Sequence, residues 1–285
     1  LKRSNEMKKV LLLALAAAAA LTSCGKTENA ADSKSSPETA QSENLVEPVI
    51  IGAQTAVKNF SSLSTEKHGY GQGVQLDDKN RPTGALDFNS AYGKYNAKAI
   101  TEDKGKIYLT FDQGYENGYT AQILDTLKEK KVKATFFVLQ DYAEKNPELV
   151  KRMIDEGHTV GNHSVSHYSM PSLSEQECRD EIEGLHKYIK DEFGYEMTEF
   201  RPPMGEFSEL SLAVTQDCGY ETVLWSYAYA DWDVDNQPSE EEAFGKLTEA
   251  VHDGAIYLLH SVSSTNTEVL PDFIDAVREK GYEFG

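Results

Sequence analysis

Two histidines in the middle of the chain have the spacing of a metal-binding pair. His163 and His167 stand with three residues between them, just after a short predicted strand. Two imidazoles placed in this way can face one ion, and neutral imidazole is a common ligand for Zn²⁺ and its first-row neighbours. Exposed or capping histidines would give the same pattern, so the pair by itself leaves both interpretations open.

Asp112 and Arg201 are charged residues at or beside predicted strands. Asp112 ends an apolar run, where an unpaired carboxylate would be costly. Taken alone, it fits a turn or helix-capping residue better than a catalytic base. Arg201 precedes two prolines and fits either a rigid turn with a solvated charge or a bidentate partner of a buried carboxylate.

Asp231 and His260 complete the set of residues that could take part in proton transfer. Asp231 precedes Trp232 and could be a loop carboxylate beside a core tryptophan. His260 ends the apolar run 256–259 and could be a core histidine with satisfied hydrogen bonds. Only the combination of these residues favours a catalytic site.

The elements that would position these residues alternate between strand and helix patterns. Strands are predicted at residues 107–111, 134–138, 159–161, 200–201, 222–226, 255–259 and 282–284. Helices are predicted at residues 120–131, 147–156, 174–193, 210–217, 240–251 and 269–280. Strict alternation favours a parallel α/β sheet, and closure into a barrel removes its exposed edges. Because active sites of such barrels lie at the C-terminal ends of the strands, we expect the polar residues there to share one pocket.

Charge and cysteine content narrow the function classes. The 285 residues include 28 Lys+Arg and 47 Asp+Glu, a net charge of −19, which argues against nucleic-acid binding through phosphates. Three cysteines cannot form a disulfide scaffold for a chain of this length. Apart from Cys24, the chain has Cys178 and Cys218, which we expect to be structural or free thiols.

The first 104 residues are expected to precede the catalytic domain. Residues 1–23 predict a secretory signal, because Lys8 and Lys9 precede an apolar stretch too short to span a bilayer. Residues 21–24 resemble the bacterial lipobox, which implies cleavage before Cys24, a lipid on its sulfur and anchoring on the outer face of the cytoplasmic membrane. An ordinary signal with an incidental cysteine is the alternative. Residues 24–47 predict a flexible tether, residues 48–104 an irregular N-terminal extension and residues 105–285 the catalytic domain.

Five segments, taken in order, resemble the motifs of the NodB-type polysaccharide deacetylases, carbohydrate esterase family 4. They are residues 110–114 (TFDQG), 163–167 (HSVSH), 201–205 (RPPMG), 231–232 (DW) and 258–260 (LLH). The resemblance covers residues 106–285 and implies an irregular, TIM-like (β/α)7 barrel of the α/β class with an N-terminal extension. Within the family, residues 114–120 (GYENGYT) and the segment 69–84 look like the delta-lactam-biosynthetic de-N-acetylases.

The resemblance also implies roles for the residues of these motifs. His163 and His167 would hold a divalent metal, expected to be Zn²⁺, which would polarise the acetamide carbonyl and make a bound water more acidic. The remaining roles are those of Asp112 as base, His260 as acid, Arg201 orienting Asp112, and Asp231 fixing the tautomer of His260. The candidates for contacts with the substrate or the oxyanion are Gln113, the backbone N–H of Tyr115, and Trp232.

Gln113 departs from the family pattern. Most members carry a second aspartate at this position, and that aspartate is the third metal ligand. Because a neutral amide is a poorer ligand for Zn²⁺ than a carboxylate, we expect weaker metal binding or a ligand shell completed by water. Replacement by a neutral residue recurs in the delta-lactam subgroup, so it also supports that assignment.

The activity that the resemblance implies is removal of N-acetyl groups from peptidoglycan sugars. In muramic acid, a free amine at C2 can reach the lactyl carboxyl at C3 and close a six-membered lactam, so N-acetylmuramic acid in stem-free peptidoglycan is the expected substrate. The alternatives are deacetylation of N-acetylglucosamine or xylan on the same fold, and an inactive glycan-binding lipoprotein. The expected partners are the peptidoglycan strand and, through Cys24, the membrane, with no nucleic acid and a monomeric protein.

Overall fold

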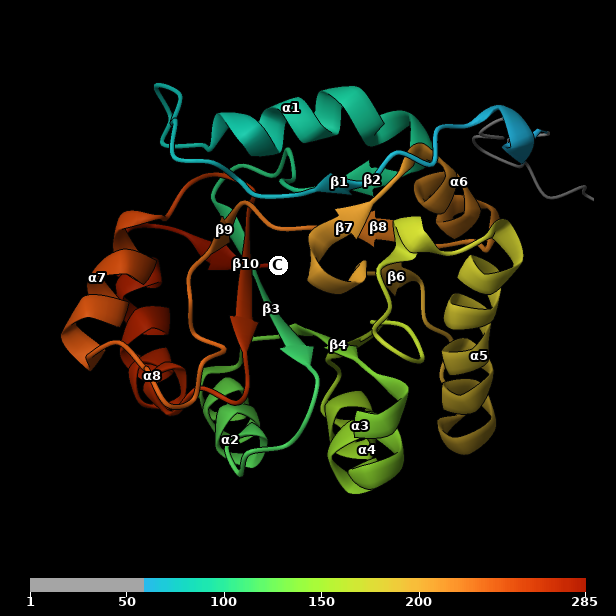
Figure 1. Ribbon diagram of the computed structural model, residues 1–285. Coiled ribbons are helices and arrows are strands. Elements are labelled where there is room, and N and C mark those ends of the chain that lie inside the picture. The colour runs from blue at the N-terminus through green and yellow to red at the C-terminus, as the bar shows by residue number, and fades with distance from the viewer. Residues whose placement is uncertain (1–58) are drawn as a thin grey trace, which may run out of the picture. The chain divides into compact units, whose positions relative to one another are not determined.

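A curled, mostly parallel β-sheet forms the centre of the computed structural model, which describes residues 59–285 (Figure 1). Its strands lie in the order β2-β8-β6-β5-β4-β3-β10-β9, and β11 pairs with the start of β3. The strands are β2 (Ala97–Lys98), β3 (Lys106–Gln113), β4 (Thr135–Val138), β5 (Thr159–Asn162), β6 (Glu199–Phe200), β8 (Glu221–Val223), β9 (Tyr227–Ala228), β10 (Ala255–His260) and β11 (Glu283–Phe284).

Helices follow the strands and cover the outer face of the curl (Figure 1). They are α2 (Thr120–Lys130), α3 (Gln140–Lys145), α4 (Pro147–Asp155), α5 (Glu175–Phe193), α6 (Glu209–Asp217), α7 (Glu240–Glu249) and α8 (Ser264–Glu279). Short 3-10 turns lie at Phe60–Ser62, Gly93–Tyr95, Met170–Ser172 and Pro203–Gly205. The predicted parallel α/β architecture is therefore confirmed, and the hydrogen-bonded path of the sheet runs from β2 to β9.

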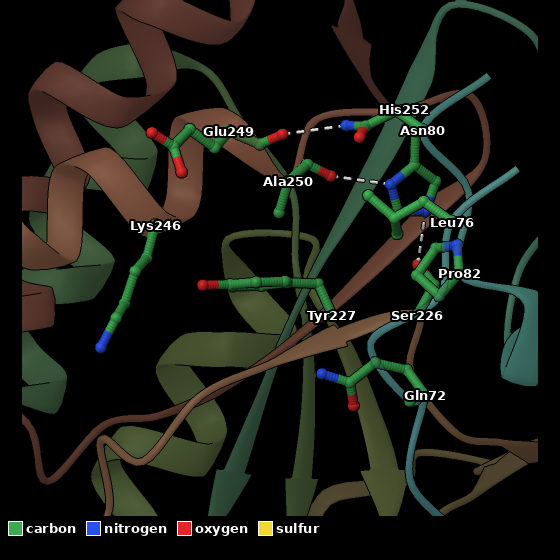
Figure 2. A pocket seen from close by; sticks show the side chains of 11 residues that line it. Gln72, Leu76, Asn80, Pro82, Ser226, Tyr227, Lys246, Glu249, Ala250 and His252 are labelled. Atoms are coloured by element: carbon green, nitrogen blue, oxygen red, sulfur yellow. Dashed lines mark hydrogen bonds between the residues drawn. The ribbon is translucent and has the colours of Figure 1, made fainter. Parts of the chain in front are cut away.

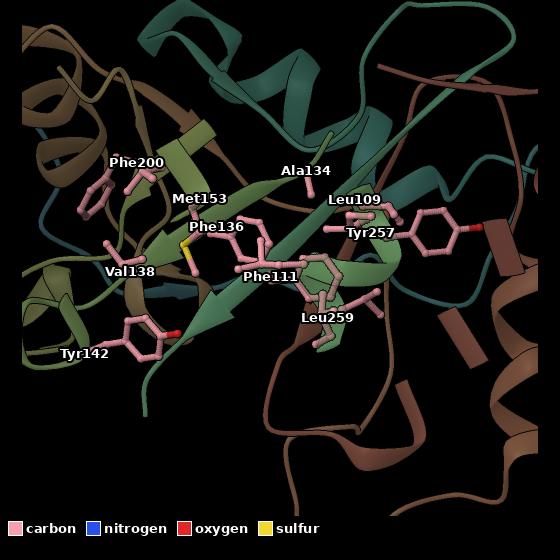
Figure 3. Packing of buried hydrophobic residues seen from close by; sticks show 14 of the residues in the cluster. Leu109, Phe111, Ala134, Phe136, Val138, Tyr142, Met153, Phe200, Tyr257 and Leu259 are labelled. Atoms are coloured by element: carbon pink, nitrogen blue, oxygen red, sulfur yellow. The ribbon is translucent and has the colours of Figure 1, made fainter. Parts of the chain in front are cut away.

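Alternate residues of the central strands β3, β4 and β10 pack in two different apolar clusters. Leu109 and Phe111 of β3 pack between the sheet and the helices, where the rings of Phe111 and Phe136 stack 5.2 Å apart (Figure 3). Ile256 and Leu258 of β10 belong instead to the cluster inside the curl. Because strand side chains alternate between faces, Asp112 is directed to the inside while its neighbour Phe111 faces the helices.

The region predicted as an N-terminal extension contains a helix and a strand of the central sheet. Helix α1 (Thr83–Tyr92) buries Ala85 and Phe88, and β2 joins the central sheet although it precedes the predicted domain boundary at residue 105. Pro82 and Gly84 are typical turn residues, so the sequence does not indicate this helix. Pro82 is instead the N-cap, and a Cβ on Gly84 would lie 2.6 Å from the carbonyl oxygen of Gln72, so the glycine allows a close backbone approach.

Helix α8 begins five residues earlier than the predicted position 269. Its first turn is polar in sequence, and the Ser263 side chain caps it by accepting the N–H of Asn266. Cys178 and Cys218 are free thiols, as expected.

The predicted signal (1–23), the lipid site Cys24 and the tether (24–47) lie outside the described residues. Within residues 59–285, none of the helices has the length and apolar character needed to cross a bilayer.

Candidate active site

A pocket of about 430 Å³ lies at the C-terminal ends of the central strands. It is lined by Asp112, His163, His167, Met204, Gly205, Trp225, Trp232, Leu258 and His260. The expectation that loops after successive strands converge on one pocket is therefore met for Asp112, both histidines of the pair, Trp232 and His260.

Asp112 is held by a fully buried arginine. Arg201 Nη1 donates to Asp112 Oδ1 at 2.8 Å, and its other nitrogens donate to the carbonyl oxygens of Val223 and Leu224. Burial opposes ionisation of Asp112, but the charge and hydrogen bond of Arg201, together with the nearby rings of His163 and His260, outweigh it and hold the pKa of this carboxyl below its ordinary value. Asp112 is thus an oriented carboxylate that can accept a proton.

His163 presents an unprotonated nitrogen on the side of Asp112. Its Nδ1 lies 2.8 Å from the carbonyl oxygen of Arg201, which can only accept, so Nδ1 carries the proton. Nε2 is then free and lies 3.6 Å from Asp112 Oδ2. Burial lowers the pKa of His163 to about 4 and also lowers the pKa of His167. The two rings, with centroids 5.1 Å apart, are therefore neutral imidazoles near pH 7.

The loop that carries the two histidines has a strained backbone. Ser164 and His167 have φ values of 78° and 58°, in the left-handed region that non-glycine residues seldom adopt. Local hydrogen bonds offset this strain: the Asn162 side chain accepts the N–H of Ser164, and the Ser164 hydroxyl accepts the N–H of His167.

Helix α5 packs directly against this loop and fixes its position. The buried Glu181 carboxylate accepts the N–H of Ser166 at 2.7 Å, and Glu181 also accepts the N–H of Val165 at its carbonyl. A Cβ on Gly184 would lie 2.9 Å from a Val165 methyl, so the helix approaches the loop too closely for a larger residue. The long helix thereby holds the segment between the two histidines.

His260 is paired with a buried carboxylate on its far side from the solvent. Asp231 Oδ1 lies 2.7 Å from His260 Nδ1, and Asp231 Oδ2 accepts the His260 N–H and an N–H of Asn266. Burial alone would lower the pKa of His260, but the hydrogen bond and charge of Asp231, together with the charge of Asp112, outweigh it and raise this pKa above its ordinary value. His260 is suited to donate a proton.

The remaining sequence candidates differ in their positions. Trp232 lines the pocket and is 61% exposed, so it is available to a ligand. Tyr115 is exposed and lies outside the pocket lining. Gln113 is buried and does not line the pocket. Its Nε2 donates to Ser261 Oγ at 2.5 Å. Strand alternation explains this, because Gln113 follows the inward-facing Asp112.

Three apolar residues of the pocket wall lie outside the set of site residues expected from the sequence. Met204 is half exposed and has a φ of 59°, and Trp225 and Leu258 lie deeper in the wall. Met204 and Leu258 stand within the motif segments and could have been found there. Trp225 carries no local signal of its own.

The residues present supply only part of a metal-binding site. Within residues 59–285, no group of three or more His, Cys, Asp or Glu side chains is arranged to hold a metal ion. His163 and His167 offer two neutral imidazoles, and the amide oxygen of Gln113 is a buried acceptor with no partner among the described residues. The two neutral imidazoles, which line the pocket, fit a divalent ion of the zinc type with few protein ligands, whereas Gln113 is not among the lining residues.

Comparisons with known proteins agree on one family. The family model described as polysaccharide deacetylase matches residues 88–223. The peptidoglycan-N-acetylmuramic acid deacetylase PdaA of Bacillus subtilis is 42% identical over 205 residues, which span 71% of this chain and 78% of the relative. The peptidoglycan-N-acetylglucosamine deacetylase PgdA of Listeria monocytogenes is 37% identical over 70% of this chain and 42% of the relative. The solved structure of Bacillus subtilis PdaA, a family 4 carbohydrate esterase, superimposes with a TM-score of 0.74 at 38% identity, covering 78% of this chain and 95% of that one.

Proposed function

The chain belongs to the polysaccharide deacetylase family, and on this premise we propose that it removes the N-acetyl group of N-acetylmuramic acid in peptidoglycan. The observation that carries the proposal is the meeting of an ionised Asp112, a neutral histidine pair and a protonatable His260 in one pocket. Amide hydrolysis needs a base for the attacking water and an acid for the departing amine, and these residues supply both.

In the proposed reaction, Asp112 takes the proton of the attacking water. Arg201 keeps Asp112 ionised and fixes the orientation of its carboxylate. His260 protonates the amine, which is otherwise a poor leaving group. Asp231 accepts the Nδ1 proton of His260, so the second proton of the imidazolium lies on Nε2, from which it is donated. A divalent ion held by His163 and His167 would, when bound, polarise the acetamide carbonyl.

The choice of muramic acid follows from the chemistry of the product and from the relatives. Deacetylation frees an amine that can close a lactam with the neighbouring lactyl group, which N-acetylglucosamine lacks. The relative named for N-acetylmuramic acid is more similar to this chain than the relative named for N-acetylglucosamine. Deacetylation of N-acetylglucosamine or of xylan is the competing function.

The decisive experiment measures acetate release from stem-free and stem-bearing peptidoglycan and identifies the deacetylated sugar by mass spectrometry. We expect acetate from stem-free glycan, with the mass change on muramic acid. Loss of acetyl only from glucosamine residues would refute the muramic substrate, and release from acetylated xylan alone would refute peptidoglycan altogether. Absence of acetate with Zn²⁺, Mn²⁺ and Co²⁺ alike would favour the inactive glycan-binding lipoprotein.

The metal site can be tested separately from activity. We propose a weak Zn²⁺ site at His163 and His167, and expect Gln113→Asp to tighten Zn²⁺ binding about tenfold by calorimetry, because a carboxylate is the stronger ligand. Gln176→Asp, on the exposed side of α5, adds the same charge elsewhere and serves as the control. Unchanged affinity in Gln113→Asp would show that this residue does not govern the ion.

From the sequence pattern we further propose a secreted, monomeric lipoprotein anchored through Cys24 and joined by a tether (24–47) to the catalytic part. Metabolic labelling with a fatty acid should mark the parent protein and not Cys24→Ala. Labelling of both proteins would refute the anchor. Light scattering of the detergent-free protein lacking the anchor checks the monomer.

A further inference from the structure

Residues 68–72 of the N-terminal extension form a strap that crosses beside the pocket. Its strand β1 (His68–Gly69) pairs antiparallel with β7 (Glu206–Phe207), and the N–H of Tyr70 donates to the carbonyl of Gly205 at 2.9 Å. Gly205 lines the pocket. The strap precedes residue 88, where the match to the family model begins, so this contact is an addition to the matched region.

The strap holds Trp225 at both its backbone and its ring. The Tyr70 hydroxyl donates to the Trp225 carbonyl at 2.5 Å, and the two rings meet edge to face with centroids 5.2 Å apart. At the other end of the indole, Trp225 Nε1 donates to Gln72 Oε1 at 3.0 Å. An indole N–H held by a single side-chain acceptor has a defined direction, so these contacts fix how the ring lies.

Gln72 also spans an interruption in the sheet. Its amide nitrogen donates to the carbonyl of Ala228 in β9, while its oxygen accepts from Trp225, just after β8. Strands β8 and β9 follow each other in the chain but are not neighbours in the sheet. Figure 2 shows Gln72 below Ser226 and Tyr227 at the edge of a separate cavity of about 250 Å³. The side-chain amide of Gln72 therefore links Trp225, just after β8, to Ala228 in β9.

The ring that the strap holds forms part of the pocket wall. Trp225 lines the pocket that contains Asp112 and His260. A Cβ on Gly205 would lie 2.8 Å from the Trp225 ring, so the ring packs directly on the strap-bonded backbone. Movement of the ring away from that contact would break the hydrogen bond between Trp225 Nε1 and Gln72.

We propose that Tyr70 and Gln72 are positioning residues that hold Trp225 as a wall of the sugar-binding pocket, so that the strap sets the affinity for substrate. This inference rests on the proposed glycan substrate. Neither residue lines the catalytic pocket, and Trp225 has no group that exchanges a proton with substrate. Loss of the clamp should therefore raise KM and leave kcat and its pH profile nearly unchanged.

The clamp itself is tested without any activity. The chain has two tryptophans, so Trp232→Phe leaves Trp225 as the only indole emitter. In that background, Gln72→Met keeps the side-chain length but removes both hydrogen bonds. We expect red-shifted emission and at least about twofold stronger acrylamide quenching, with Gln75→Ala, an exposed neighbour in the extension, behaving like its parent. Unchanged acrylamide quenching in Gln72→Met would refute the proposal that Gln72 holds the Trp225 ring in place.

The effect on substrate is measured in the chain that retains both tryptophans. One lost hydrogen bond corresponds to a change of up to about tenfold in binding, so we expect KM for stem-free glycan to rise about three- to tenfold in Gln72→Met. Tyr70→Phe, which removes the hydroxyl and keeps the aromatic ring, provides a second variant and should also raise KM. A mobile Trp225 with unchanged KM, or a fall in kcat alone, would overturn the proposed role.

Failure of the proposed function gives a different result from failure of this inference. If the parent protein releases no acetate from any glycan, the enzyme assignment fails while the quenching comparison still decides whether the strap holds Trp225. Binding of a stem-free muramyl disaccharide, followed by calorimetry, then replaces KM. Equal affinity of parent and Gln72→Met for this disaccharide would refute the proposal that the strap holds Trp225 as a wall of the sugar-binding pocket.

Discussion

The two ends of β5 each carry a buried histidine, and only one of them belongs to the pocket. His158 precedes the strand and His163 follows it, and burial lowers the pKa of both rings to about 4. At His158, Nδ1 accepts the backbone N–H of Ala134, so the proton is on Nε2. At His163, Nδ1 donates to the Arg201 carbonyl, so Nε2 keeps its lone pair.

This difference shows that a shifted pKa does not by itself identify a functional histidine. The His158 ring lies edge-on to Phe136 in the apolar core, and its Nε2 has no partner among the described residues. The His163 ring stands beside Asp112 and His167. The backbone group bonded to Nδ1 decides which tautomer each histidine adopts. The end of β5 at which the histidine lies decides which side chains surround it.

The largest effect is expected at the buried carboxylate Asp112, and a small one at the half-buried carboxylate Glu199. Asp112→Asn removes the base and should lower kcat/KM for acetate release by about 10³-fold. Glu199→Gln is its control inside the curl, because burial raises the pKa of Glu199 and a neutral amide is a close substitute. We expect Glu199→Gln to stay within about twofold of the parent. A comparable loss in both variants would remove the functional distinction between the two carboxylates.

A smaller but still large effect is expected when His260 loses its partner. The raised pKa of His260 keeps it protonated above its ordinary titration range, so activity should fall only as pH rises through this raised value. Asp231→Asn removes the charge that raises the pKa, so the alkaline limb should move to lower pH and kcat/KM at pH 8 should fall about 10- to 100-fold. Asp235→Asn, an exposed neighbour, is the control. An unmoved limb in Asp231→Asn would contradict the assignment of His260 as acid.

A moderate effect is expected from the helix that positions the histidine loop. Glu181→Ala removes the acceptor of the Ser166 N–H and should weaken Zn²⁺ binding about tenfold by calorimetry. Glu181→Gln keeps an acceptor oxygen and should restore most of the affinity. If both variants bind Zn²⁺ like the parent, the positions of the two metal-binding histidines do not depend on the Glu181 hydrogen bond from α5.

The smallest effect on activity is expected at the other end of β5. His158→Gln should change acetate release at pH 7 by less than about twofold, because His158 is remote from the pocket. The pH dependence of the free energy of unfolding should change instead in this variant. The folded pKa of His158 is below its unfolded value, so its contribution is present above pH 6.5 and is lost as pH falls toward about 4, by at most about 3 kcal/mol. Urea unfolding at pH 4.5 and 7 should therefore show a smaller pH difference in His158→Gln, and an equal difference would exclude this account.

Much of the fold was predictable because its elements depend on local patterns. The apolar runs that predict β3 and β10 and the helical spacing that predicts α2 are read from neighbouring residues. Helix α1 was not predicted, because the need for Gly84 comes from a strap backbone more than ten residues away. Gln113 illustrates the same limit: its motif position is plain in the sequence, but its partner Ser261 is 148 residues away.

The sequence by itself determined which chemical groups the protein has and the order in which strands deliver them to one end of the sheet. Alternation and strand order are local properties, and they were sufficient to place Asp112, His163, His167 and His260 together. Only the tertiary structure decided what these groups can do. The tautomer of His163 depends on the carbonyl of a residue 38 positions away, and the orientation of Trp225 depends on Gln72, 153 positions away. Hydrogen-bond partners at such separations are chosen by packing, which is why no local pattern encodes them.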